Sequence, residues 1–276
     1  MASDADSFTS KVSDFSLRGL DGLAEQYSPP PIGNFTPNGY WKQSYAMFVL
    51  VPLGALKVGE FSLERKVKGP TDFMLAATIR RYASPGFSHF QRAEIRCRLD
   101  ALATPVSWLF DTKLAREATA PPYLQSGRRR SASVHNSVMM VRDRLRSTNI
   151  VLDGAYSNEW SLLEAIQRLP GEMTPNMHYT LIDEFDTPQQ AHTLIFRDKV
   201  NVPLKNGTIL LTGYCDLGTA VVPTTYWVDE HHRLIFVCSG LTVYALTATN
   251  GHPGQCPDRF SGSEPGSAQR PGKEAQ

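Results

Sequence analysis

The chain has 276 residues, of which 41% are hydrophobic and 20% are charged, and its formal net charge is +1. This composition is that of a globular protein with enough apolar side chains for a large core. The near-zero net charge argues against a dedicated polyanion-binding protein, so we expect no nucleic-acid partner.

The N-terminal segment carries a weak helical pattern. Apolar residues recur every three to five positions from Phe8 to Tyr27, interrupted by Gly19 and Gly22, and a proline run ends at Pro31. We therefore predict a helix and a stiff linker in residues 1–33. The acidic, polar start of the chain is the reverse of a signal peptide. We expect a cytoplasmic protein, or a periplasmic one if a leader has been removed.

From Tyr45 onward the hydrophobic period changes to two. The clearest alternation runs from Gln91 to Leu99 and predicts a half-buried antiparallel strand. We expect its apolar residues, Ala93, Ile95, Cys97 and Leu99, to face the interior and its charged residues to face away. By contrast, Ala120–Ser131 is rich in Pro, Gly and Arg and predicts a surface loop. The apolar run from Tyr45 to Leu56 is too short to span a membrane, so no transmembrane segment is expected.

One segment breaks the strand pattern. Asn158 can cap a helix, the apolar residues that follow it form one stripe, and Pro170-Gly171 ends it. We predict an amphipathic helix over 158–169, inside a single β-rich domain of residues 34–249. Residues 250–276 lack any apolar period and are expected to be disordered.

The predicted strands are joined by short links, which excludes parallel βαβ winding and favours an antiparallel meander. A long meander has to fold into a sandwich, close as a barrel or wrap a helix. The sequence therefore predicts a mainly β fold: a strongly curved sheet or barrel-like meander around one inserted helix.

The run from Leu53 to Arg65, LGALKVGEFSLER, resembles the opening hairpin of bacterial β-rich proteins of unknown function of the DUF3108 type. The resemblance covers about one hairpin and the general strand order. It implies a curved half-barrel around an apolar groove, like that of lipoprotein carriers. Those proteins are usually exported, whereas this chain shows no leader. The resemblance carries over no catalytic residue.

The four cysteines, Cys97, Cys215, Cys238 and Cys256, do not form a C-x-x-C pair, and no His pair stands beside them. We therefore expect no metal site. A cross-strand disulfide between Cys215 and Cys238 is left open. No P-loop, nucleophile elbow or dinucleotide-binding turn is present, so no cofactor is expected.

Polar candidates for chemistry are His89, Asp183 and His192. Asp183 begins a carboxylate-rich turn, which suits acid–base work or a divalent metal but is more typical of a solvated loop, so no metal ligand is assigned. A second possibility is an anion-binding wall made by His89 and Arg92. We interpret the basic run Arg128–Arg130 as part of a solvated loop.

Three functions remain open. The first is a binding protein for a small apolar or amphiphilic molecule, with the candidate lining residues Trp108, Phe110, Trp160, Tyr226 and Trp227. The second is a cofactor-independent isomerase, cyclase or hydrolase that uses the same cavity. The third is an assembly subunit that acts through its basic loop and tail.

Overall fold

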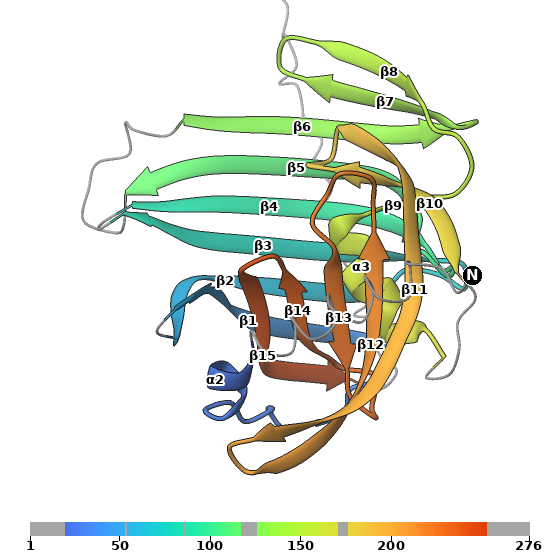
Figure 1. The fold of residues 1–276 in the computed structure, drawn as a ribbon. Coiled ribbons are helices and arrows are strands. Elements are labelled where there is room, and N and C mark those ends of the chain that lie inside the picture. The colour runs from blue at the N-terminus through green and yellow to red at the C-terminus, as the bar shows by residue number, and fades with distance from the viewer. Residues whose placement is uncertain (1–19, 53, 85–86, 117–125, 171–175, 253–276) are drawn as a thin grey trace, which may run out of the picture.

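The computed structural model describes residues 20–52, 54–84, 87–116, 126–170 and 176–252. These residues form one 15-stranded sheet with the spatial order β8-β7-β6-β5-β4-β3-β2-β1-β15-β14-β13-β12-β11-β10-β9. Neighbouring strands pair antiparallel except β9 and β10, which pair parallel. The prediction of a mainly β, antiparallel, strongly curved sheet is confirmed (Figure 1).

The first half of the chain contributes a short helix and eight strands: α2 (Asp21–Ala24), β1 (Tyr40–Val51), β2 (Gly54–Val67), β3 (Asp72–Ser84), β4 (Phe87–Arg98), β5 (Pro105–Arg116), β6 (Ser126–His135), β7 (Val138–Asp143) and β8 (Ser147–Val151). The second half contributes the inserted helix and seven strands: β9 (Tyr156–Asn158), α3 (Glu159–Ala165), the 3-10 helix η2 (Ile166–Arg168), β10 (Met177–Asp183), β11 (Thr187–Leu204), β12 (Gly207–Leu217), β13 (Thr224–Val228), β14 (Leu234–Ser239) and β15 (Thr242–His252).

The sheet curls around α3 but does not close into a barrel. Register shifts interrupt several ladders, for example at Ser44/Tyr45 and Phe196/Asp198, and such bulges bend and twist strands. Because of this bending, α3 lies on the concave side between β3 and β13 (Figure 1).

Contacts outside the ladder tie the two ends of the sheet together. The hydroxyl of Ser157 in β9 donates to the Leu102 carbonyl at 2.7 Å, and the Trp108 indole N–H in β5 donates to the Phe185 carbonyl at 3.1 Å. Arg130 in β6 forms an ion pair with Asp186 at 2.7 Å. Side-chain contacts, not a strand pair, thus join the β4–β6 region to β9 and to the turn between β10 and β11.

Helix α3 is buried on nearly all sides. Asn158 caps it by accepting from the backbone N–H groups of Trp160 and Ser161. Its apolar residues are buried as expected, but its polar residues Ser161 and Glu164 are also fully buried. The predicted span of 158–169 is therefore corrected: the α-helix ends at Ala165 and a 3-10 turn follows.

The buried polar residues of α3 have partners on the sheet. Glu164 forms an ion pair with Arg65 of β2 at 2.7 Å, and Gln167 of the following turn η2 accepts from Gln43 of β1 at 2.8 Å. The hydroxyl of Ser161 lies 3.4 Å from the Cys97 sulfur. Because each such group would be costly to bury alone, these contacts fix the orientation of α3 against β1, β2 and β4.

The alternation in β4 holds for three of its four apolar residues. Ala93, Ile95 and Cys97 are fully buried, whereas Leu99 is 41% exposed. The prediction for Leu99 is wrong because β4 ends at Arg98 and the chain turns there. On the outer face, Arg92 pairs with Glu94, and Arg96 with Asp72 of β3.

Two further expectations are corrected. The predicted loop 120–131 becomes strand from Ser126 onward, so Arg128–Arg130 lie in β6, where Arg128 pairs with Asp143. Strand β15 runs to His252, so the first three residues of the predicted tail belong to the sheet. The remainder of that tail, most of the N-terminal helix and Cys256 lie outside the described residues.

The cysteines of β12 and β14 do not form the disulfide that the sequence left open. Cys215 and Cys238 are buried free thiols, as is Cys97. Strand β13 lies between the two strands that carry Cys215 and Cys238, so these residues are not cross-strand neighbours.

Candidate functional site

A cavity of 790 Å³ lies on the concave side of the sheet, above the first turn of α3. Its walls come from β1–β4 on one side and β10–β15 on the other, and Glu159, Trp160 and Leu163 of α3 also line it. The volume is in the range of sites that bind small molecules.

An apolar row crosses four neighbouring strands of this wall. Met47 of β1 is paired with Tyr244 of β15, Tyr244 with Val237 of β14, and Val237 with Tyr226 of β13. Directly paired residues of a sheet point to the same face, so these four side chains form one continuous surface. Val49, Val58, Phe61 and Ile79 extend it onto β1, β2 and β3.

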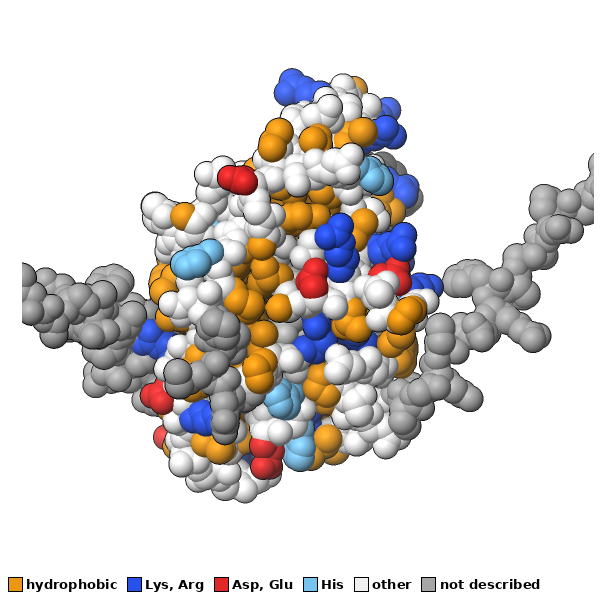
Figure 2. All heavy atoms as spheres, turned by 90° about the vertical axis from the view of Figure 1, so that its right-hand side faces the viewer, with side chains coloured by type: hydrophobic (Ala, Val, Ile, Leu, Met, Phe, Trp, Pro, Cys, Tyr) orange, Lys and Arg blue, Asp and Glu red, His pale blue; other side chains and the backbone are white. Residues whose placement is uncertain are grey.

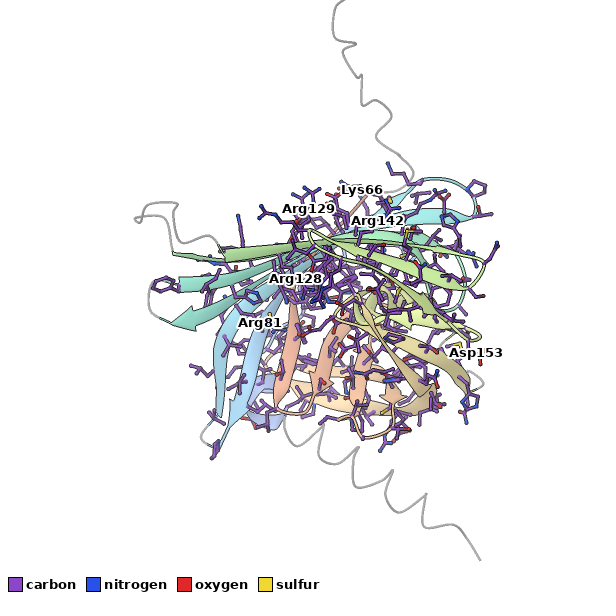
Figure 3. The ribbon with its side chains drawn as sticks, turned by 90° about the horizontal axis from the view of Figure 1, so that it is seen from above. Lys66, Arg81, Arg128, Arg129, Arg142 and Asp153 are labelled. Carbon is purple, nitrogen blue, oxygen red and sulfur yellow. The ribbon has the colours of Figure 1, made fainter. Side chains whose placement is uncertain are left out.

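A polar arc faces this surface. Arg81 and His89, which are paired across β3 and β4, stand on one side, and Asp183, Gln189, His192 and Asp216 stand on the other. Glu159 belongs to the arc from the start of α3. Figure 3 labels Arg81, the strand residue that supplies the guanidinium of this arc.

Hydrogen bonds join the β10–β12 part of the arc into a chain. Gln189 donates its amide N–H to Asp183 at 2.9 Å, and its carbonyl lies 3.3 Å from Nε2 of His192. Nδ1 of His192 lies 2.9 Å from Asp216, which also accepts from the hydroxyl of Tyr179 at 2.6 Å. These partners fix the ring of His192 in the wall.

The ring of His192 lies between two polar partners, the Asp216 carboxylate at Nδ1 and the Gln189 carbonyl at Nε2. His192 is 1% exposed, and a Cβ added at Gly218 would lie 2.5 Å from its Cε1. Gly218 therefore lets the backbone pack directly over this ring.

Glu159 differs from the other carboxylates of the arc. Its side chain is exposed to the cavity, but the surrounding walls displace bulk water and raise its pKa to about 7. The negative charge of Asp183 raises this pKa further, and the positive charge of Arg81 opposes the rise. Glu159 thus changes charge near neutral pH.

The three polar candidates from the sequence all line the cavity: His89, Asp183 and His192. The predicted anion-binding wall of His89 and Arg92 is wrong for Arg92, because Arg92 lies on the outer face in an ion pair with Glu94. Arg81, two residues along the strand from Ile79, takes the cavity position instead. The alternation of inward and outward side chains along β3 could have identified Arg81, because it places Arg81 on the same face as Ile79.

The aromatic candidates divide into two groups. Trp160 and Tyr226 line the cavity. Trp108 and Phe110 instead pack against Phe185, with ring centroids 6.3 and 4.7 Å away. Trp227 is fully buried over Gly213, where a Cβ would lie 2.5 Å from its ring. The residue type alone does not separate core aromatics from lining aromatics.

Sequence reasoning missed Glu159. A glutamate in the first turn of a helix is usually a favourable surface charge beside the helix N-terminus, so the sequence gives no reason to assign Glu159 to a site. Here the helix begins inside the curved sheet, and its first turn forms the cavity floor. No local pattern distinguishes these two cases.

The described residues contain no cluster of three His, Cys, Asp or Glu side chains suited to a metal ion. Among the same residues, no helix is long and apolar enough to cross a membrane. Figure 2 shows the face at the right of Figure 1, where hydrophobic side chains form a band between scattered charges.

Comparison with solved structures relates the chain to known proteins at the level of fold. No protein-family profile matches the chain, and no curated protein does. The chain is similar to a crystal structure of a β-barrel-like protein of domain of unknown function DUF1849 from Brucella abortus. The TM-score is 0.51 at 10% identity, over 78% of this chain and 98% of the other. This likeness shows the fold, a β-barrel-like one, and supports the resemblance to β-rich proteins of unknown function but not the DUF3108 assignment.

Proposed function

We propose that the protein binds a small amphiphilic molecule in the cavity, with the apolar part of the ligand on the β1, β13, β14 and β15 wall. The observation that carries the proposal is the division of one 790 Å³ cavity into a continuous apolar row and a polar arc. An apolar ligand gains from burying its surface against the row. Its polar end can replace lost water contacts with hydrogen bonds to the arc.

A cofactor-independent enzyme is the second candidate. It is favoured by the placement of His89, Asp183 and His192 on the wall of the same cavity. A group with a pKa near the working pH is the kind that general acid–base catalysis uses, and Glu159 fits this description.

Fluorescence titration with anilinonaphthalene sulfonate tests ligand binding. The native protein should bind the dye at one site. Val58→Trp places a large side chain at the cavity wall and should weaken binding at least about tenfold, a loss of about 1.4 kcal/mol. The matched control is Val151→Trp, on the exposed edge strand β8, where Val151 is 74% exposed. This control should bind as the native protein does.

Both variants must first show the thermal midpoint of the native protein, because partly unfolded chains also bind this dye. Absence of binding to the native protein, or equal binding by both variants, would contradict the proposal.

A further inference from the structure

Two oppositely charged groups face the same cavity from different elements. Glu159 begins α3, and Arg81 lies on β3 at the position paired with His89 of β4. Both line the cavity, together with the rings of Trp160, Tyr226 and Tyr244. Within the part of the chain that the structure describes, Arg81 forms no ion pair, so its guanidinium can contact a molecule in the cavity.

We propose that Glu159 and Arg81 form a proton-transfer site for carbonyl compounds with an apolar body. The inference rests on the proposed ligand binding and assigns a substrate class to the same cavity. The carboxylate of Glu159 removes a proton from the carbon next to the carbonyl group. The electron pair of the broken C–H bond forms the C=C bond of an enolate, and the carbonyl π pair moves to the oxygen.

Arg81 stabilises the negative oxygen that forms in this step. A fixed donor in a site with little water stabilises developing charge more strongly than water does. Arg81 lies close to Tyr244 on this side of the cavity, where its positive charge opposes the rise in the pKa of Tyr244 that burial causes. The proton then returns from Glu159 to the same carbon, or to the far carbon of a conjugated enolate, which isomerises the double bond. Neither route needs an oxidant, a reductant or a second substrate.

The surroundings of Glu159 suit this role. Charged and titratable groups face it from four sides: Arg81 on β3, Asp183 and Glu184 at the end of β10, Tyr226 on β13 and Tyr244 on β15. The surrounding cavity walls and the two carboxylates raise the pKa of Glu159 to about 7. The carboxylate is therefore a stronger base than an ordinary glutamate and is still ionised in part at neutral pH.

The apolar surface beside Glu159 and Arg81 determines which kind of hydrocarbon part a substrate can have. Met47, Val237 and Tyr226 offer a continuous hydrophobic wall with no charged side chain among them. A fused-ring or branched hydrocarbon ketone matches this wall, whereas a sugar would leave its hydroxyl groups unpaired there.

Hydrogen–deuterium exchange of β-tetralone tests the inference without knowledge of the natural substrate. The ketone is incubated with the full-length protein in deuterated buffer, and proton NMR follows loss of the signal from the carbon next to the carbonyl. Quenching of tryptophan fluorescence measures ketone binding separately. The native protein should accelerate exchange above protein-free buffer, with a rate that is half-maximal near pH 7 and levels off at higher pH as Glu159 becomes fully ionised.

Three variants assign the roles. Glu159→Gln keeps the shape of the side chain and should lower the exchange rate about 100-fold, with loss of the pH step and little change in ketone binding. Arg81→Met should lower the rate, and Arg81→Lys should restore part of it. Glu94→Gln, on the outer face, should behave as the native protein does.

The outcomes separate the two proposals. Ketone binding without exchange above buffer overturns the proton-transfer site and leaves ligand binding standing. Equal exchange by native protein and Glu159→Gln also overturns it. If neither the ketone nor the dye binds, ligand binding fails, and the proton-transfer site fails with it.

Discussion

Arg65 of β2 and Glu164 of α3 form an ion pair at 2.7 Å in the interior, where their side chains are 2% and 0% exposed. Arg168 contacts the same carboxylate oxygen at 2.8 Å, and Arg65 also donates to the carbonyl of Asn38. This pair joins the inserted helix to the sheet below the cavity. It therefore fixes where the first turn of α3, with Glu159, lies.

Loss of one partner of this pair should be severe. Glu164→Leu leaves two arginines without their carboxylate in the interior, and removing one member of a buried pair typically costs about 3–5 kcal/mol. Urea unfolding of the variant checks this cost. Glu94→Leu removes an exposed pair with Arg92 and should cost less than about 1 kcal/mol. Similar losses for the two variants would contradict the interior position of Glu164.

Trp160 anchors α3 through aromatic contacts. Its ring lies 5.0 Å from Phe185, 5.9 Å from Phe110 and 6.2 Å from Phe61, between ring centroids, and the residue is 4% exposed. Trp160→Ala should cost about 3–5 kcal/mol, because it empties a large buried site. The free energy of unfolding from urea titration is the readout.

Leu145→Ala is the control for that measurement, since Leu145 is 87% exposed and should change stability by less than about 0.5 kcal/mol. A loss below about 1 kcal/mol for Trp160→Ala would place the helix on the surface instead.

The three buried thiols report whether the interior of the sheet stays inaccessible in solution. Burial raises the pKa of Cys97, that of Cys215 to about 11 and that of Cys238 to about 12. Because the thiolate is the reactive form, these thiols should label very slowly at pH 7.5. The test uses Cys256→Ser, so that the three described cysteines are the ones counted. Three thiols should react after unfolding, and fast labelling of the native protein would contradict the burial of the cysteines on β4, β12 and β14.

Glu159 should make stability fall as pH rises. Its pKa in the folded protein, about 7, lies above the ordinary value of an unfolded glutamate. The folded state therefore binds more protons than the unfolded state between about pH 4.5 and pH 7, and the free energy of unfolding decreases across this window. Glu159→Gln removes the dependence and should raise the thermal midpoint more at pH 8 than at pH 5.

Glu94→Gln is the control for this pH experiment, because Glu94 lies on the outer face in an exposed pair. It should shift the midpoint equally at the two pH values. The same equal shift in Glu159→Gln would mean that the carboxylate of Glu159 is surrounded by bulk water.

The two-residue alternation of hydrophobic and polar side chains predicted the fold well in strands that have one buried face and one solvent-exposed face. In β4 it assigned Ala93, Ile95 and Cys97 correctly, because alternation fixes the face of every residue in a continuous strand. It failed at Leu99, where the strand ends, and at Arg128–Arg130. There, ion pairs with Asp143 and Asp186 allow a strand in a segment whose composition is typical of a loop.

The site was less predictable because it is built from residues far apart in the chain. His192 and Asp216 meet through strand pairing, and Gln189 reaches Asp183 across a hairpin. The sequence around a titratable residue does not show which distant group that residue will contact in the folded protein. Trp108 and Trp227 show the same limit for apolar residues, since each fills the core beside a cavity that it does not line.

Amide chemical-shift mapping of the ¹⁵N-labelled protein tests ligand binding in the cavity most directly. On saturation with anilinonaphthalene sulfonate, the largest shifts should fall on the wall around Met47, Tyr244 and Val237 and on the first turn of α3. The outer faces of β4 and β6 should stay unchanged. Shifts that concentrate on those outer faces, or that leave the cavity wall unchanged while the dye is bound, would contradict the account.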